Sequence, residues 1–327
     1  MRILITGGFG FIGTLLTRAL LSAGAFAGQP IREVVLADKA IRQDDPAARD
    51  LRVSVVAGEL ALSLPRIFAD RVDVVFHLAS AVSAEAETDF DLGMSANLQS
   101  TIKLLEAARH QRGRPATLVF SSSLAVYGAD PAIPLPAVVD ECTLAIPQSS
   151  YGTQKLACEQ LIADYTRKGF LDGRIARLMT VSVRPGTPNG AASGFLSAVI
   201  RDPLAGIRAI CPVSPHREVA LASPDRTVEG LLRIATAQRG SGPGQLAGRA
   251  PINLPALTVT VSDMLDALRL VAGDGVANLV TVRPDPAIET IVGSWPARFD
   301  NSRAAALGLK PDSTFVEVID QFRNVRI

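Results

Sequence analysis

Short apolar runs alternate with segments of helical spacing along the first half of the chain. Runs of about five residues rich in Val, Ile and Leu, bounded by glycine or polar residues, are typical of buried parallel strands. They predict strands over residues 2–6, 33–37, 53–57, 72–78, 116–120 and 174–183. Between them, apolar residues recur every three or four positions, which predicts helices over 11–20, 94–110 and 151–167. This alternation predicts an α/β fold with a doubly wound parallel sheet, the Rossmann arrangement.

The pattern changes beyond Arg184, where proline, glycine and alanine become frequent and the segments shorten. Ser223 and Pro224 form a helix start, with serine as N-cap and proline at the first helical position. Ser262 is expected to cap another helix. Further helices are predicted over 195–204 and 315–322, and strands over 258–261 and 280–283. We therefore predict a Rossmann domain over residues 1–183 and a smaller α/β substrate lobe over 184–327, whose segments can interleave with the first domain.

Composition and charge narrow the class of protein. The 327 residues are 48% hydrophobic and 20% charged, which is typical of a globular chain. With a net charge of +1, the chain lacks the excess of positive charge that is typical of proteins that bind nucleic acid or an acidic membrane surface. No apolar run reaches the length of a membrane span, and residue 2 already begins a strand, so we expect no signal peptide. The three cysteines and three histidines are scattered, so we expect no metal site and a reducing, cytoplasmic location.

A glycine-rich turn joins the first predicted strand to the first helix. Gly7, Gly10 and Gly13 stand between them, in the context that gives such a motif meaning. Glycines let the backbone approach a pyrophosphate, whose charge is stabilised by N–H groups at the helix N-terminus. Asp38 ends the second strand, where a carboxylate can accept hydrogen bonds from ribose hydroxyls and repel a 2′-phosphate. This pattern predicts NAD rather than NADP; the alternative is that Asp38 only caps its strand.

A second motif predicts acid–base chemistry. Tyr151 and Lys155 are four residues apart on a predicted helix and share one face. A phenol is a poor base at neutral pH, but an ammonium group one turn away stabilises the phenolate. Ser123 ends the fifth strand and could hold a substrate oxygen beside Tyr151. Either motif alone is common by chance, whereas the two in this order, after a glycine turn, predict hydride transfer at a secondary alcohol.

The chain resembles the extended short-chain dehydrogenase/reductase family, which includes the sugar-nucleotide epimerases and dehydratases. The matching motifs are TGGFGFIG (6–13), HLAS (77–80), NLQST (97–101), SSSLAVYG (121–128), YGTQK (151–155), PHREV (215–219), PINLP (251–255) and FDNSRAAALGLKPD (299–312). The resemblance implies that Ser123, Tyr151 and Lys155 are catalytic. It also implies that NAD is bound by Gly7, Gly10, Phe11, Ile12, Gly13, Asp38, Glu59, Leu60, Leu78, Ala79, Ser80, Asn97, Ser121, Tyr151, Lys155, Thr180 and Val181.

Departures from the family pattern bear on the substrate. Thr180 stands where the sugar-nucleotide enzymes carry an asparagine that helps hold a diphosphate, and the Tyr-Gly-Pro turn after it is missing. Leu124 and Ala125 replace the Asp-Glu pair that dehydratases need. The run over residues 183–206 resembles NAD-dependent dehydrogenases of small sugar acids such as D-erythronate. This resemblance implies oxidation of a 2-hydroxy acid to the 2-keto acid.

Two arginines are candidates for holding the carboxylate of such an acid. Arg217 stands where the family places an arginine on the substrate's phosphate, and a guanidinium fork suits a carboxylate equally well. Arg184 is the second candidate, although a lone arginine is more often part of a surface ion pair. Ser80, Ser83 and Ser123 are the predicted partners of substrate hydroxyls.

Three alternatives stay open at this point. A sugar-nucleotide 4-epimerase would keep NAD bound and release no NADH. An NAD-sensing regulator without activity would commonly lack the tyrosine or the lysine, and both are present here. The helices over 94–110 and 151–167 resemble a pair that forms a homodimer interface in the family. Their apolar positions, including Leu98, Ile102, Leu105 and Ala108, could equally face the core of a single chain.

Overall fold

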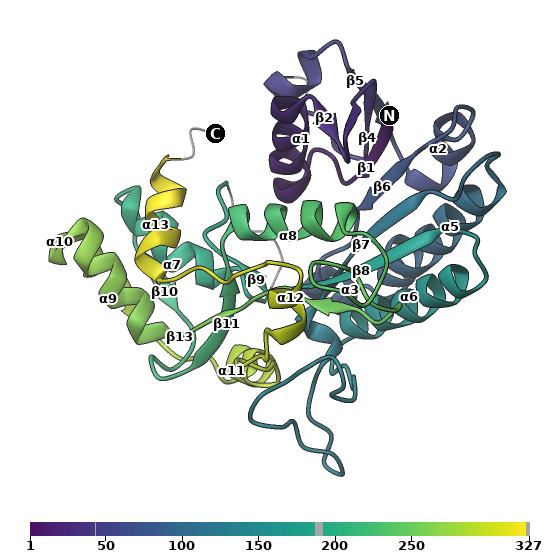
Figure 1. Ribbon diagram of the computed structural model, residues 1–327. Coiled ribbons are helices and arrows are strands. Elements are labelled where there is room, and N and C mark those ends of the chain that lie inside the picture. The colour runs from purple at the N-terminus through teal and green to yellow at the C-terminus, as the bar shows by residue number, and fades with distance from the viewer. Residues whose placement is uncertain (43, 187–191, 325–327) are drawn as a thin grey trace.

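A seven-stranded parallel sheet organises the protein. The computed structural model describes residues 1–42, 44–186 and 192–324. The strand order is β12–β8–β7–β6–β1–β4–β5, and every neighbouring pair is parallel (Figure 1). The strands are β1 (Arg2–Thr6), β4 (Glu33–Asp38), β5 (Val53–Ala57), β6 (Val74–His77), β7 (Thr117–Ser123), β8 (Asp172–Leu178) and β12 (Ile252–Asn253). The predicted doubly wound α/β fold is confirmed.

The strand order reverses at β1. The chain passes from β1 to β4 and β5 on one side, and then returns to β6, β7 and β8 on the other. β1 and β6 are fully buried along their length, because helices cover both faces of the sheet. The carboxyl ends of the strands beside such a reversal leave a crevice in which ligands bind. The fold therefore places the candidate site at the ends of β1, β6 and β7.

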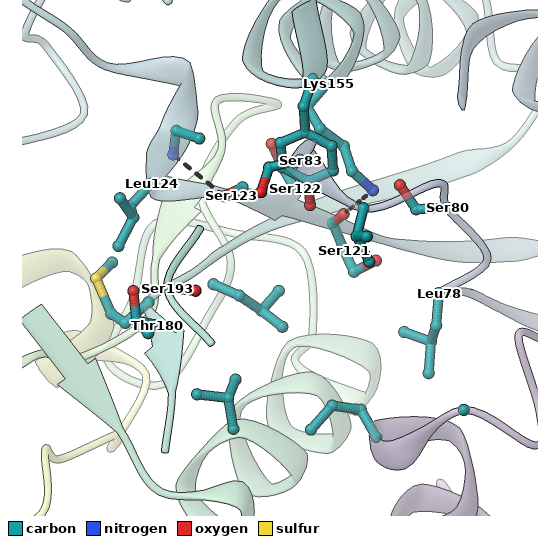
Figure 2. A pocket seen from close by; sticks show the side chains of 18 of the residues that line it. Leu78, Ser80, Ser83, Ser121, Ser122, Ser123, Leu124, Lys155, Thr180 and Ser193 are labelled. Carbon is teal, nitrogen blue, oxygen red and sulfur yellow. Dashed lines mark hydrogen bonds between the residues drawn. The ribbon is translucent and has the colours of Figure 1, made fainter. Parts of the chain in front are cut away.

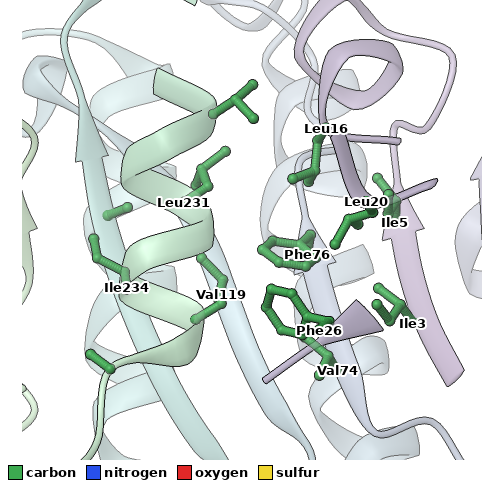
Figure 3. Packing of buried hydrophobic residues seen from close by; sticks show 14 of the residues in the cluster. Ile3, Ile5, Leu16, Leu20, Phe26, Val74, Phe76, Val119, Leu231 and Ile234 are labelled. Carbon is green, nitrogen blue, oxygen red and sulfur yellow. The ribbon is translucent and has the colours of Figure 1, made fainter. Parts of the chain in front are cut away.

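Two layers of helices cover the sheet. One layer consists of α2 (Leu60–Ile67), α5 (Ser100–His110) and α6 (Ser150–Arg167). The other consists of α1 (Phe11–Ala23) and α8 (Pro224–Thr236), with the small hairpin of β2 (Ala25–Phe26) and β3 (Gln29–Pro30). Figure 3 shows this second layer, in which Leu16, Leu20 and Phe26 face Phe76 and the α8 residue Leu231. Burial of these apolar side chains holds α1, and with it the glycine turn, against the sheet.

The remaining elements form a second body beside the carboxyl ends of the strands (Figure 1). It contains a three-stranded sheet of β9 (Thr180–Val181), β11 (Glu218–Ala222) and β13 (Leu257–Thr260), and a pair of β10 (Ala209–Cys211) and β14 (Val280–Val282). Its helices are α7 (Phe195–Leu204), α9 (Val261–Ala272), α10 (Asp274–Ala277), α11 (Pro286–Gly293) and α13 (Phe315–Asn324), whereas α12 (Ser302–Ala306) packs on β12 of the main sheet. An apolar core that includes Leu196, Val199, Leu221, Met264 and Val318 holds it together.

Three short helical segments complete the part of the chain near the site. These are α3 (Ser83–Thr88), α4 (Phe90–Gly93) and a π-helical turn, η2 (Met94–Gln99), that runs directly into α5. Short 3-10 turns lie at η1 (Pro46–Arg49) and η3 (Leu124–Val126). Among the described residues, no helix combines the length and the apolar character needed to cross a membrane.

Four local predictions are corrected. The strand predicted over 174–183 is two strands, because the chain leaves the main sheet after β8 and β9 joins β11 instead. The N-cap of α9 is Thr260 and not Ser262. The Thr260 hydroxyl accepts from the Asp263 amide, and the Asp263 carboxylate accepts from the Thr260 amide. The helix predicted over 94–110 begins as the π-helical turn η2, and on α5 Leu105 and Ala108 face the core while Ile102 is 37% exposed. The sheet has a seventh strand, β12, where five or six were expected.

Two segments from beyond residue 184 belong to the main sheet. The α8 helix packs against α1, β7 and β8, and β12 pairs with β8. The predicted start of α8 is confirmed: Ser223 Oγ accepts from the Arg226 amide, and Pro224 is the first helical residue. Chain segments thus cross between the two bodies more than once, and the domain division at residue 184 stays a prediction.

Candidate active site

The glycine turn is closed by contacts that a side chain would prevent. Gly7 has φ +69°, and a Cβ there would lie 2.9 Å from the Ala79 amide nitrogen. A Cβ on Gly13 would lie 2.2 Å from the Gly7 carbonyl oxygen. Gly10 is the N-cap of α1, and no side chain caps the helix there. The first-turn amides of α1 therefore face an open, glycine-lined cradle, which fits the pyrophosphate of a dinucleotide.

A pocket of about 350 Å³ connects this cradle to the end of β7 (Figure 2). Most of the predicted site residues line it: Gly7, Gly10, Phe11, Ile12, Gly13, Leu78, Ser80, Ser83, Ser121, Ser123, Tyr151, Lys155, Thr180, Val181 and Arg184. Residues without a predicted role also line the pocket: Ala81, Val82, Ser122, Leu124, Ala125, Leu178, Met179, Ser193 and Trp295. Ser193 lies within the run over residues 183–206 and Trp295 lies just before the motif at 299–312, but neither residue is part of a pattern that predicts a role in the site. The site is thus one continuous pocket that both bodies line.

Asp38 supports the glycine turn directly. Its Oδ2 accepts from the Phe9 amide at 2.9 Å, and its Oδ1 accepts from the Ala40 amide at 3.1 Å. Each carboxylate oxygen has a further lone pair with which it could accept from a ribose hydroxyl. Asp38 does not itself line the pocket, so its role in choosing NAD stays a prediction.

Replacing Asp38 with asparagine tests that role. We expect the preference for NAD over NADP, measured as the ratio of kcat/KM values, to fall at least ~10-fold, since the charge that repels a 2′-phosphate is lost. The asparagine oxygen can accept from the Phe9 amide, but its NH2 group cannot replace Oδ1 as the acceptor for the Ala40 amide, so the variant also loses that hydrogen bond. An unchanged ratio would assign Asp38 to the turn alone.

A buried histidine joins β6 to the turn and to α5. His77 Nδ1 lies 2.7 Å from Thr6 Oγ1, and its Nε2 lies 2.9 Å from Thr101 Oγ1. Because the Thr101 hydroxyl donates to the Asn97 carbonyl, Nε2–H is the donor and Nδ1 accepts from Thr6. Burial, with the nearby Lys155, lowers the pKa of His77 to about 3. The imidazole therefore stays neutral and has a structural role beneath the site.

Lys155 is buried and points toward the end of β7 (Figure 2). Its Nζ donates to the Ser121 carbonyl at 2.8 Å. It also lies 4.8 Å from the Phe120 ring centroid and 5.5 Å from the Tyr151 ring centroid. The ammonium group is thus held beside the tyrosine ring by a backbone acceptor and by two aromatic faces. This arrangement matches the predicted pairing of Tyr151 with Lys155.

The start of α6 packs tightly on the turn that follows Ser123. Ser149 caps α6 by accepting from the Gly152 amide at 3.1 Å. A Cβ on Gly152 would lie 2.1 Å from the Ala125 carbonyl oxygen, so only glycine permits this approach. Ser123 Oγ accepts from the Ala125 amide at 3.1 Å, which leaves its hydroxyl hydrogen free to donate into the pocket. These contacts bring Ser123, Tyr151 and Lys155 to one wall of the pocket.

Asn97 positions the exit of β6 from outside the pocket. Its Oδ1 accepts from Ser80 Oγ at 2.9 Å and from the Ala81 amide at 2.7 Å, and its Nδ2 donates to Gln154. It is buried, so its predicted contact with NAD would be indirect.

Glu59 is exposed and pairs with Lys39. The predicted residues that do not line the pocket are Asp38, Glu59, Leu60, Ala79, Asn97 and Arg217.

The two candidate arginines lie in different surroundings. Arg217 is paired with Glu289 at 2.8 Å, away from the pocket. Arg184 lines the pocket, and its Nη2 donates to Ser193 Oγ at 3.1 Å. Within the described part of the chain, Arg184 has no carboxylate partner. Burial lowers the pKa of its guanidinium, and the neighbouring Arg201 acts in the same direction. A substrate carboxylate would supply the missing counter-charge. Residues 187–191 of the predicted substrate segment lie outside the described residues.

A buried ion pair lies directly behind the wall that Ser123, Tyr151 and Lys155 form. Arg177 Nη2 and Nε donate to the two oxygens of Glu159 at 2.6 and 2.9 Å, and both side chains are almost fully buried. Ser122 Oγ donates to the same carboxylate at 2.5 Å. Because Glu159 is one turn after Lys155 on α6, this pair fixes the helix against β7 and β8.

Removing one member of this pair should destabilise the fold. We expect Glu159→Ala to lower the free energy of unfolding by about 3–5 kcal/mol, since it leaves the Arg177 charge buried without a partner. Glu229→Ala breaks the half-exposed Arg226–Glu229 pair and should cost less than about 1 kcal/mol. Denaturant unfolding of the two variants measures both values. Equal losses would contradict the assignment.

Residues 3–218 match the model of the NAD dependent epimerase/dehydratase family. The chain belongs to this family. Its resemblance to the family, its Rossmann fold and NAD as its cofactor are thereby confirmed.

Relatives within the NAD dependent epimerase/dehydratase family match over nearly the full length. The chain is 46% identical to D-erythronate dehydrogenase of Cupriavidus necator, over 98% of this chain and 97% of that protein. It is 41% identical to D-erythronate dehydrogenase of Haemophilus influenzae, over 98% of both. Among solved structures, a nucleoside-diphosphate-sugar epimerase from Agrobacterium tumefaciens is 37% identical with a TM-score of 0.88, covering 98% of this chain and 92% of that one.

Proposed function

We propose that this protein is an NAD-dependent dehydrogenase that oxidises a short 2-hydroxy sugar acid, D-erythronate or a close analogue, to the 2-keto acid. The observation that carries the proposal is the position of Arg184. Its guanidinium lines the same pocket as Ser123, Tyr151 and Lys155, and it has no acidic partner among the described residues. A substrate with a carboxylate next to a secondary alcohol would satisfy both parts of this site.

The residues divide the chemistry among them. Arg184 holds the carboxylate, and the Ser123 hydroxyl donates to the oxygen of the C2 hydroxyl group. Tyr151, with the Lys155 ammonium beside its ring, accepts the hydroxyl proton as the C–O bond becomes a carbonyl. Bound NAD supplies the acceptor for the hydride that leaves C2. The proton goes to Tyr151 and the electron pair goes with the hydride, so the two-electron oxidation balances.

Two relatives named D-erythronate dehydrogenase support this proposal, because they match over almost their entire length. The second candidate is a sugar-nucleotide 4-epimerase, which the structural neighbour from Agrobacterium tumefaciens favours. The pairing of Arg217 with Glu289 argues against it, since the arginine that the family resemblance assigns to a substrate phosphate is already neutralised.

The assay combines the purified protein with NAD and acids of four to six carbons, and follows the absorbance of NADH. We expect steady NADH formation with D-erythronate. An epimerase would instead interconvert UDP-sugars without net NADH. Absence of NADH formation with every aldonate and uronate would overturn the proposal.

We further propose that the protein forms a homodimer through α5 and α6. The support is the position of Ile102, an apolar residue of α5 that is 37% exposed rather than buried. Light scattering on the purified protein gives the molar mass in solution. A mass equal to one chain at assay concentration would exclude the dimer.

A further inference from the structure

The only tryptophan of the chain stands at the substrate end of the pocket. Trp295 packs against the apolar cluster that contains Leu124, which follows β7, and Met179, which follows β8. It also packs against the cluster that contains Val183. Trp295 lines the same pocket as Ser123 and Arg184. An indole side chain is the bulkiest group that a protein can place there. Its bulk therefore takes up room in the pocket that a substrate would share.

One end of the segment that carries Trp295 is clamped by a charged pair. Trp295 follows α11, whose Glu289 accepts from Arg217 Nη2 at 2.8 Å and from Nε at 3.3 Å. The same carboxylate accepts from the Ser214 amide. A Cβ on Gly293 would lie 3.2 Å from the Arg217 guanidinium, so the last turn of α11 rests directly on it. The Ser214 amide and Arg217 hold the pKa of the Glu289 carboxyl below its usual range, which keeps the pair charged near neutral pH.

The other end of the segment is held by backbone contacts. The Val139 amide donates to the Arg298 carbonyl, and the Asp300 amide donates to the Val139 carbonyl, each at 2.9 Å. Thr258 Oγ donates to the Ala297 carbonyl at 2.6 Å. Residues 294–300, here called the Trp295 segment, are thus fastened on both sides of the tryptophan. A side chain on a segment held in this way makes a firm wall rather than an adaptable one.

We propose that Trp295 is a specificity-determining residue that sets the upper chain length of the acid, and that Arg217 and Glu289 are positioning residues that hold it there. The inference rests on the proposed function, because it names the substrate feature that the same site selects. It gives Arg217 a role other than binding the substrate anion. It also accounts for Trp295 and Glu289, which the reaction itself does not use.

Chain-length selectivity tests the wall. The measured quantity is the kcat/KM for a six-carbon aldonate divided by that for D-erythronate. We expect Trp295→Ala to raise this ratio at least ~10-fold, because space opens for the longer acid while the short one loses packing. Trp295→Phe, which retains most of the bulk, should stay close to the wild-type ratio. If the alanine variant is folded and its ratio is unchanged, the proposal is overturned.

The clamp is tested through its dependence on Trp295. We expect Glu289→Gln to shift the same ratio in the same direction by a smaller factor, and Glu289→Asp to restore part of the wild-type value. In the Trp295→Ala background, Glu289→Gln should change the ratio no further, since its effect passes through the indole. An equal effect in both backgrounds would show that Glu289 does not act through Trp295.

Fluorescence separates this inference from the proposed function. Because Trp295 is the only tryptophan, its emission reports the substrate end of the pocket directly. In a Tyr151→Phe protein saturated with NAD, D-erythronate should change the emission, and Trp295→Phe should abolish the signal. If wild-type protein oxidises no sugar acid, the proposed function fails. If it oxidises D-erythronate but the emission and the ratio do not respond, only the role of Trp295 fails.

Discussion

Tyr151→Phe is expected to lower kcat by about 10³-fold while NAD still binds. In the proposed mechanism the Tyr151 oxygen, as the phenolate, accepts the substrate proton, and a positioned acid–base group contributes about 10²–10⁴-fold to a rate. Phenylalanine keeps the ring beside Lys155, so the pocket retains its shape. Steady-state kinetics with D-erythronate measures the loss, and titration with NAD measures cofactor binding.

Tyr165→Phe is the matched control for this change. Tyr165 is the α6 residue whose hydroxyl donates to Glu106 of α5, and it does not line the pocket. We expect the control to keep kcat within about 2-fold of wild type, as a surface hydroxyl loss away from the site has a small effect. Turnover that survives in Tyr151→Phe would exclude Tyr151 as the acid–base group.

Arg184→Met is expected to reduce kcat/KM for D-erythronate by roughly 10²-fold or more. Truncating one partner of a buried, hydrogen-bonded charge pair costs about 2–5 kcal/mol, and each 1.4 kcal/mol is about tenfold. Methionine keeps the unbranched stem, so the neighbouring side chains retain a packing partner. Most of the loss should fall on KM if the guanidinium binds the carboxylate equally in the ground and transition states.

Arg217→Met provides the comparison, since both arginines were candidates for the substrate anion. With Arg217 paired to Glu289, its loss should change kcat/KM for D-erythronate far less than the loss of Arg184. For a substrate analogue in which an amide replaces the carboxylate, kcat/KM should differ little between wild type and Arg184→Met, because the analogue has no charge for the guanidinium to bind. The opposite order of effects would move the anion site to Arg217.

Local features were predictable because their determinants lie within a few residues of each other. The strand, glycine turn and α1 follow from one apolar run and from glycines that the turn requires, as the φ of +69° at Gly7 shows. Tyr151 and Lys155 share a face because the helical repeat places positions four apart together. The small-sugar-acid specificity came from resemblance, and relatives of that name support it.

Tertiary contacts decided what the local pattern could not. β12 has only two residues, which is too short for the sequence to predict a strand, and it forms by pairing with the edge of β8. The residues beside Arg184 and Arg217 in the sequence do not reveal their partners, and only the fold brings Glu289 to Arg217 and places Arg184 at the pocket.

Trp295 shows the same division most clearly. It stands outside every motif, and the helix before it, α11, is held in place because its Glu289 pairs with Arg217, which is distant along the chain. The sequence by itself determined the fold class, the glycine turn and the shared helix face of Tyr151 and Lys155, since each depends on short-range periodicity and backbone conformation. Long-range packing decides which charged side chains are paired and which side chains line the pocket, so only the tertiary structure could show these features.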